Sequence, residues 1–243
     1  MKHLDQRVQS AVKFFWQTRD KQSRYQGVKS GVKDAGLRTA ATGGAQLDGF
    51  ATLVEELLLE NGIKRSEISN GRRGVEIPGW FRPEKKWDLL VVSQEQLIAA
   101  VEFKAHIGPS FGNNFNNRTE EALGNATDVL AAYREGAFKP SLRPWLGYLM
   151  LIEDTPKSRA PVGVAEPHFR VFDEFRDASY IRRYEIGLTK LLREQLYDGA
   201  CLLASPREGG LNGDFCEPSQ ELAFRNFAGG LIARAIAHAK TRK

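Results

Sequence analysis

Short apolar runs alternate along this chain with segments whose apolar side chains recur at helical spacing, and this alternation most constrains the fold. The predicted strands cover 88–92, 97–104, 146–152 and 200–204. The predicted helices cover 4–20, 46–60, 118–134, 180–197 and 221–238. Strands separated by helices are typical of a sheet covered by helices. We therefore expect an α/β fold, more exactly an α+β mixed sheet flanked by helices.

The length of 243 residues is enough to bury a sizeable core, and no internal repeat or low-complexity segment divides it. We therefore expect a single domain over residues 1–243. Within it, residues 1–45 are predicted to form an N-terminal elaboration of helix and loop. The Gly- and Lys-rich part of this elaboration, which ends near Gly44, is predicted to be mobile.

The composition favours a nucleic-acid partner and excludes a membrane span and a zinc site. Lysine and arginine outnumber aspartate and glutamate by 35 to 30, and a net charge of +5 suits a polyanionic partner such as nucleic acid. No run approaches the about 18 apolar residues of a membrane span, and the first residues contain no apolar signal segment. We therefore expect a cytoplasmic protein that does not enter a membrane. The two cysteines and four histidines lack the spacing of a zinc site.

The predicted hairpin of 88–92 and 97–104 carries two acids and a lysine. Period-two alternation places Glu102 and Lys104 on one face, and a register in which paired residue numbers sum to 190 places Asp88 opposite Glu102. Two carboxylates and the backbone carbonyl of Phe103 are oxygen ligands of the kind that Mg²⁺ takes. The Lys104 ammonium could orient or help deprotonate an attacking water and offset charge on a phosphorane.

The spacing of an acid, any residue and a lysine is expected about twice by chance in such a chain. Glu84-Lys85-Lys86 also fits it, but lies in a polar segment that we predict to be a loop flanked by proline. Burying charges on an apolar strand is costly unless they are paired or bind a metal. The hairpin alone is therefore compatible with a metal site and equally with a structural ion-pair cluster at the edge of the sheet.

The predicted helix 46–60 offers a further acid before the hairpin. Glu55 falls at the edge of the apolar stripe, where its side chain can reach around the sheet to order a water or a second metal ion. Glu56 points away from the stripe. A solvated helix face explains Glu55 equally well.

The segment 108–118 contains four asparagines, and we expect it to open the helix 118–134. Amide groups and positive charge at a helix N-terminus can contact phosphates and base edges. A capping pair of Asn117 and Glu120 would explain one asparagine of the four. The candidate base contacts are Asn113, Asn114, Asn116, Asn117 and Arg118. The candidate phosphate contacts are Arg38, Arg72, Arg73, Lys85 and Lys86, each of which is otherwise a solvated surface charge.

The order of Glu55, Asp88 and Glu102-Phe103-Lys104 resembles the PD-(D/E)XK nuclease superfamily. More narrowly, the chain is similar to the XhoI family of type II restriction endonucleases through the runs FATLVEELLLENGI, VEFKAHI and GPSFGNNFNNRTEEALGNATD. The likeness extends over nearly the full chain. One difference is that Trp87 precedes Asp88, where the strict superfamily pattern has a proline.

This resemblance implies a PD-(D/E)XK core over 46–205, with Asp88, Glu102, Lys104 and Glu55 as catalytic residues. It implies a homodimeric, Mg²⁺-dependent enzyme that cuts double-stranded DNA within CTCGAG after the first C and leaves 5′ TCGA overhangs with 5′-phosphates. It also implies a DNA methyltransferase that protects the same site. A palindromic site suits a two-fold dimer, because each subunit can read one half-site and cut one strand.

Two other hypotheses remain open. A structure-specific repair or junction nuclease on the same core would cut according to DNA shape rather than sequence. A non-catalytic DNA-binding protein would keep the acids only as an ion-pair cluster and would cut nothing. Metal-dependent cleavage at a fixed sequence separates both from the restriction endonuclease.

Overall fold

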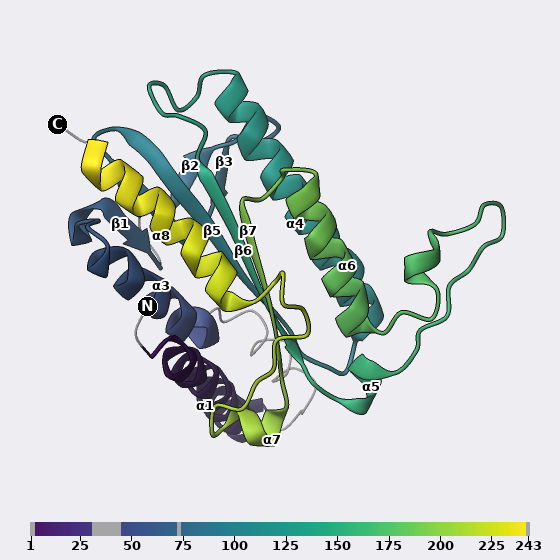
Figure 1. The fold of residues 1–243 in the computed structure, drawn as a ribbon. Helices are drawn as coiled ribbons and strands as arrows, with labels where there is room; N and C mark the ends of the chain where they lie inside the picture. The colour runs from purple at the N-terminus through teal and green to yellow at the C-terminus, as the bar shows by residue number, and fades with distance from the viewer. Residues whose placement is uncertain (1–2, 31–44, 72–73, 242–243) are drawn as a thin grey trace.

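A computed structural model of the chain describes residues 3–30, 45–71 and 74–241, and shows a five-stranded sheet between two layers of helices (Figure 1). The strand order is β1-β4-β5-β6-β7. These strands are β1 (Ile68–Asn70), β4 (Leu89–Ser93), β5 (Gln96–His106), β6 (Trp145–Glu153) and β7 (Gly199–Ser205). The pairs β1/β4 and β4/β5 are antiparallel, whereas β5/β6 and β6/β7 are parallel. The predicted mixed sheet flanked by helices is confirmed.

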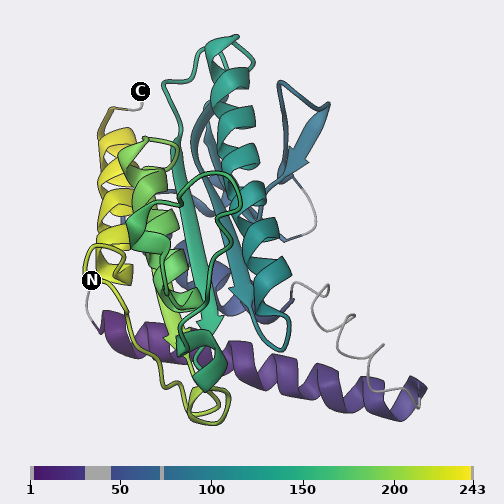
Figure 2. The ribbon, with the colours of Figure 1, turned by 90° about the vertical axis from the view of Figure 1, so that its right-hand side faces the viewer.

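The helices divide between the two faces of the sheet (Figure 2). The first layer contains α1 (Leu4–Ser30), α3 (Asp48–Glu60) and α8 (Phe224–Thr241). The second layer contains α4 (Phe111–Arg134) and α6 (Tyr180–Arg193). Shorter elements are η1 (Ala45–Leu47), η2 (Arg65–Glu67), α5 (Pro156–Arg159), η3 (Asp173–Phe175) and α7 (Arg207–Gly210). Because α4 and α6 each connect two parallel strands, both lie on one face, as crossover connections of one hand require.

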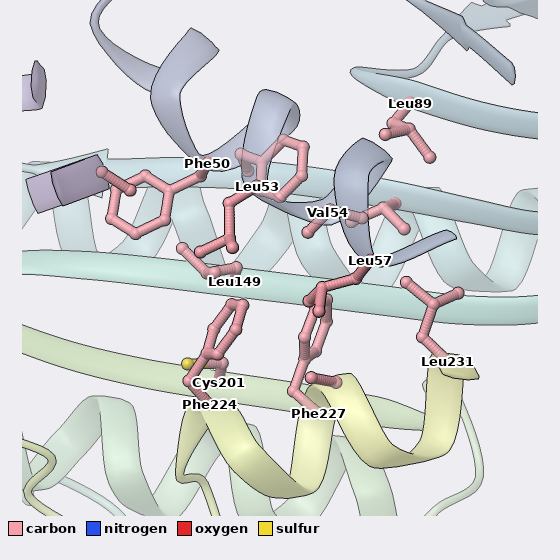
Figure 3. Packing of buried hydrophobic residues seen from close by; sticks show 14 of the residues in the cluster. Phe50, Leu53, Val54, Leu57, Leu89, Leu149, Cys201, Phe224, Phe227 and Leu231 are labelled. Atoms are coloured by element: carbon pink, nitrogen blue, oxygen red, sulfur yellow. The ribbon is translucent and has the colours of Figure 1, made fainter. Parts of the chain in front are cut away.

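The core of the first layer forms where α3 and α8 meet over the strands (Figure 3). Phe50, Val54 and Leu57 recur at helical spacing on α3, and all three are buried. Phe227 and Leu231 of α8 belong to the same buried cluster, on the same face of the sheet. This apolar stripe explains why residues 48–60 form the helix predicted from the sequence.

The hairpin of β4 and β5 has the predicted register where the two strands begin to pair. Leu89 pairs with Val101, and the next two pairs also have residue numbers that sum to 190. A bulge between Val91 and Val92 then shifts the register by one residue. The turn residues Gln94 and Glu95 have φ values of 50° and 62°, which is typical of a two-residue hairpin turn.

A second hairpin, formed by β2 (Glu76–Pro78) and β3 (Glu84–Lys86), lies beside α4 and was not predicted (Figure 2). The prediction of a loop at Glu84-Lys85-Lys86 is therefore wrong, since Lys85 pairs with Ile77. Strands of three residues are too short to show a period of two in the sequence. Ile77 and Trp87 pack into the core of the second layer and hold this hairpin to the sheet.

The long helix α4 begins at Phe111, seven residues before the predicted start at Arg118. Phe111 is buried and Phe115 packs beside it against Tyr180 and Tyr184, so the asparagine-rich run has an apolar face that supports helix. The predicted cap at Asn117 is therefore wrong, because Asn117 lies in the second turn of α4.

Three other helix bounds differ from the prediction. Helix α1 continues to Ser30 rather than ending at Asp20, since the following residues include good helix formers such as Lys21 and Gln22. Helix α6 ends at Arg193, and the φ of 55° at Gln195 stops it before residue 197. Helix α8 begins at Phe224, whose backbone N–H donates to the Glu217 carboxylate at 2.7 Å.

Some predictions fall on residues outside the described ranges. These are the mobile segment as far as it covers 31–44 and the phosphate contacts predicted for Arg38, Arg72 and Arg73. Within the described ranges, no helix combines the length and the apolar character needed to cross a membrane.

Candidate active site

The predicted acids Asp88 and Glu102 lie together at the end of the β4–β5 hairpin. Asp88 comes directly before β4, and its Oδ2 accepts a hydrogen bond from the Phe103 backbone N–H at 2.7 Å. Glu102, the neighbour of Phe103 on β5, is only 2% exposed. The observed register thus brings both carboxylates to one point, on the face of the sheet that α4 covers.

The environment of Asp88 raises the pKa of its carboxyl group from 3.8 to about 6. Burial contributes most, and the negative charge of Glu102 adds to it. The hydrogen bond from Phe103 and the positive charges of Lys104 and Lys85 oppose the shift without cancelling it. Two ionised carboxylates this close repel each other, so a divalent cation between them would stabilise the ionised form of both.

Two lysines hold Glu102 from opposite sides. The Nζ of Lys104 lies 2.5 Å from Glu102 Oε1, and the Nζ of Lys85 lies 2.9 Å from Oε2. Burial alone would lower the pKa of Lys104, but the ion pair with Glu102 and the negative charges of Asp88 and Glu121 together outweigh it, and the pKa is raised. Lys104 is therefore a protonated ammonium at neutral pH, and it lies on the same face of β5 as Glu102, as the alternation predicted.

The donor atoms here fit a hard divalent cation. The N–H and C=O of one strand residue point to the same side, so the Phe103 carbonyl faces the side on which its N–H meets Asp88. Among the residues that the structure describes, no group of three or more acidic, histidine or cysteine side chains could hold a metal ion. Two carboxylates and one carbonyl suit Mg²⁺, which keeps several waters and is often completed by phosphate oxygens.

Glu55 of α3 contacts Arg65 and Asn70 rather than the cluster of Asp88, Glu102 and Lys104. Its Oε1 lies 2.5 Å from Arg65 Nη1, and its Oε2 accepts a hydrogen bond from Asn70. Asn70 pairs with Leu89 in the sheet, one residue after Asp88. The structure thus places Glu55 near the hairpin end, linked to it through β1.

The asparagine-rich run divides between two sides of α4. Asn113, Asn116 and Asn117 are exposed, whereas Asn114 and Arg118 are half-buried. Arg118 Nη1 lies 2.6 Å from Glu121 Oε2, and the same oxygen lies 3.8 Å from Lys104 Nζ. Arg118 is therefore joined to the cluster of Asp88, Glu102 and Lys104 through one shared carboxylate.

Sequence reasoning missed how the β2–β3 hairpin is attached. Asp128 of α4 is buried, and its Oδ1 accepts the backbone N–H groups of Trp80 and Phe81, each at 2.8 Å. Its Oδ2 accepts from Arg82 Nε at 2.7 Å. A side chain at Gly79 would place its Cβ 2.5 Å from Asp128 Oδ2, so only glycine fits there. Asp128 thus holds the hairpin that carries Lys85 to the site.

Replacing Asp128 with alanine should lower the free energy of unfolding by roughly 2–4 kcal/mol, because two backbone N–H groups and the Arg82 guanidinium lose their buried acceptor. Its hydrogen bonds overcome the effect of burial and lower the pKa of Asp128. The stabilisation is therefore present at neutral pH and is lost as the pH falls through that lowered pKa. Urea unfolding at pH 7 and at a series of pH values below 3.8 tests both statements. Glu120→Ala, at an exposed position of the same helix, should change stability by less than about 0.5 kcal/mol.

Comparison with known proteins agrees with this geometry. Residues 26–217 match the family model of the restriction endonuclease XhoI. The type II restriction enzyme BstVI of Geobacillus stearothermophilus is 50% identical over 212 residues, which are 85% of this chain and 94% of that enzyme. The type II restriction enzyme AbrI of Azospirillum brasilense is 48% identical over 166 residues, 68% of this chain and 74% of that enzyme.

The type II restriction enzyme XhoI of Xanthomonas vasicola is 47% identical over 158 residues, which cover 65% of this chain and 64% of that enzyme. No solved structure matches the chain. The resemblance noted in the sequence is confirmed by the family model and by these relatives. The chain therefore belongs to the XhoI family of type II restriction endonucleases, which are site-specific deoxyribonucleases.

Proposed function

We propose that this restriction endonuclease uses Mg²⁺ to hydrolyse double-stranded DNA within CTCGAG after the first C, leaving 5′ TCGA overhangs with 5′-phosphates. The observation that carries the proposed chemistry is the pair of the half-buried Asp88 and the buried Glu102, with two ammonium groups on the Glu102 carboxylate. The cleavage sequence rests on the resemblance of the chain to its family. Type II restriction enzymes generally use divalent metal ions, and Mg²⁺ is the ion that this oxygen donor set suits.

Asp88, Glu102 and the Phe103 carbonyl would hold the metal ion. When bound, it would polarise the scissile phosphate and make a bound water more acidic. The Lys104 ammonium, protonated at neutral pH, would orient the attacking water by hydrogen bonding and offset the negative charge that grows on the phosphorane. Because it already carries its proton, its proposed role is electrostatic rather than that of a general base.

Contacts to DNA are proposed for residues on both sides of this site. Lys85 and Lys86 of β3 would contact phosphates, Lys85 by leaving Glu102 when that carboxylate engages a cation. Asn113, Asn114, Asn116, Asn117 and Arg118 would contact bases or phosphates from α4. This position of the helix fits, since Arg118 shares Glu121 with Lys104.

The proposed assembly is a homodimer, because a palindrome presents the same half-site on both strands. A DNA methyltransferase that modifies the same sequence would be the functional partner in a restriction-modification system. Such an enzyme would act in the cytoplasm, on DNA that enters the cell.

Digestion of a sequenced plasmid with Mg²⁺, against an EDTA control, tests the proposal, and sequencing of the fragment ends locates the cut. Discrete cuts at CTCGAG would support the reaction, the sequence and the overhang together. Discrete cuts at another sequence would contradict the proposed site only. Cuts that follow nicks or junctions would favour a repair nuclease, and intact DNA under all metal ions would favour a binding protein.

Glu55→Ala is expected to slow cleavage by about 10-fold, a smaller loss than we expect at Lys104, because Glu55 acts at most through a water or a second cation. Single-turnover cleavage of a duplex oligonucleotide measures the effect. Glu56→Ala, one residue further along α3, removes an exposed carboxylate that pairs with Arg7 and should leave the rate unchanged. An unchanged rate for Glu55→Ala would assign its contacts with Arg65 and Asn70 a structural role only.

A further inference from the structure

The tip of the β2–β3 hairpin exposes two adjacent aromatic side chains. Trp80 is 54% exposed and Phe81 is 72% exposed. Rings of this size normally bury most of their surface, and neighbouring exposed rings mark a contact surface more often than single ones do. The side chains at this tip therefore need a partner outside the described chain or a functional reason for their exposure.

The backbone that carries these rings is held firmly. The buried carboxylate of Asp128 accepts the N–H groups of both residues, and Arg82 binds the same carboxylate and also Asn125 Oδ1 at 2.9 Å. The exposure of the rings is thus built into a fixed turn on α4. Rings displayed on a fixed backbone lose little conformational entropy when they bind, which favours their use as contact residues.

Helix α4 contacts both the tip and the candidate active site, at positions separated by a short length of helix. Asp128 follows Glu121 by seven residues on α4, and Glu121 Oε2 lies 3.8 Å from Lys104 Nζ. A rise of about 1.5 Å per residue separates the two acids by about 10 Å along the helix. Successive base pairs of duplex DNA are about 3.4 Å apart, so this spacing corresponds to about three base pairs.

Charge and position favour DNA as the partner of the rings. The hairpin that carries them also carries Lys85, which binds Glu102, and Lys86, an exposed side chain whose Nζ lies 3.9 Å from Glu76 Oε1 and could turn to a phosphate instead. Figure 2 shows the hairpin beside α4, on the side away from α6 and α8. DNA whose scissile phosphate lay at Glu102 and Lys104 would therefore have this tip within its reach.

We infer that Trp80 and Phe81 form an aromatic wedge that contacts the base stack of DNA about three base pairs from the scissile phosphate and partly unstacks one step. This inference rests on the proposed function, because it takes the scissile phosphate to lie at the Asp88 and Glu102 cluster. A wedge of this kind makes binding depend on how easily the contacted step deforms, and so adds to sequence discrimination.

Tryptophan emission provides the first test. The other three tryptophans, Trp16, Trp87 and Trp145, are buried, so DNA that contacts the hairpin tip should alter mainly the emission of Trp80. Duplex DNA containing CTCGAG, added with Ca²⁺ in place of Mg²⁺, should quench the emission and reduce its quenching by acrylamide. Trp80→Phe should remove both changes. If Trp80→Phe shows the same changes as the wild type, the inference is wrong.

Binding affinity provides the second test. Trp80→Ala and Phe81→Ala should each weaken binding of the duplex in Ca²⁺ by about 10-fold, since contacts between bases and aromatic rings carry effects of this size. The salt dependence of binding should stay unchanged, because no phosphate contact is lost. Phe169→Ala, which removes a ring that is 88% exposed outside this hairpin, is the matched control and should bind as the wild type does.

A base analogue locates the wedge on the DNA. 2-Aminopurine placed about three base pairs from the cut should brighten with the wild type and not with the double variant of Trp80 and Phe81. Unchanged affinity in both single variants would overturn the inference. It would also be overturned if the wild type is a dimer and the double variant a monomer, because the tip would then be a contact between subunits. Failure of the proposed function is distinguishable, because the wild type itself would then leave the plasmid intact.

Discussion

Lys104→Ala is expected to reduce the rate of DNA cleavage by at least about 100-fold while leaving DNA binding within a few-fold of the wild type. One preorganised donor to the charge of a transition state typically contributes this much. The variant should fold, because Lys85 still pairs with the buried Glu102. Single-turnover cleavage of a duplex oligonucleotide in Mg²⁺ measures the rate, and titration of the same duplex in Ca²⁺ measures binding.

Two further variants serve as comparisons for the cleavage rate of Lys104→Ala. Lys85→Ala removes the other ammonium from Glu102, and a smaller loss of rate there would assign the electrostatic role to Lys104 in particular. Lys13→Ala, at an exposed position of α1, should cleave at the wild-type rate. Cleavage by Lys104→Ala at the wild-type rate would show that the reaction takes place elsewhere or without this ammonium.

Asp88→Asn is expected to abolish cleavage and at the same time to stabilise the metal-free protein by about 1–3 kcal/mol at pH 7. Asparagine keeps an acceptor for the Phe103 N–H and removes a carboxylate that the site disfavours. The shift of the Asp88 pKa from 3.8 to about 6 corresponds to about 3 kcal/mol between the two protonation states. A residue whose loss stabilises the fold while it abolishes activity is one retained for its chemistry.

The pH dependence of this effect has a definite sign. Between pH 4 and pH 6 the folded wild type keeps the proton on Asp88 that the unfolded chain has lost, so its stability falls as the pH rises. The stability gained in the variant is therefore small near pH 4 and complete above about pH 6. Urea unfolding in EDTA at a series of pH values measures it. Asp173→Asn, at a side chain that is 94% exposed, should show no such gain.

The pairing of the two acids could be predicted because it depends only on local rules. Period-two alternation and one hairpin register place Asp88 beside Glu102, and the observed pairing of Leu89 with Val101 has that register. The predicted register fails only beyond the bulge at Val91, on the side of the hairpin away from the acids. A bulge depends on the fit of strands to neighbouring elements and leaves no clear pattern in a five-residue strand.

The contact of Lys85 with Glu102 could not be predicted, since it depends on contacts between distant parts of the chain. Its strand has three residues, and the hairpin is held by Asp128, which lies more than forty residues further along the chain. The start of α4 in the asparagine-rich run was predicted wrongly for a related reason. Asparagine disfavours helix interiors, but burial of Phe111 and Phe115 against α6 outweighs this local preference.

The position of Glu102 and Lys104 on β5 has a consequence for how the enzyme loses activity. This strand is the central one of five, with β4 on one side and β6 on the other. Local opening of a protein starts at termini, loops and sheet edges, whereas central strands exchange their amide hydrogens only on global unfolding. The proposed pair of Glu102 and Lys104 should therefore keep its geometry until the protein unfolds globally, so that activity is lost with the whole fold rather than in steps.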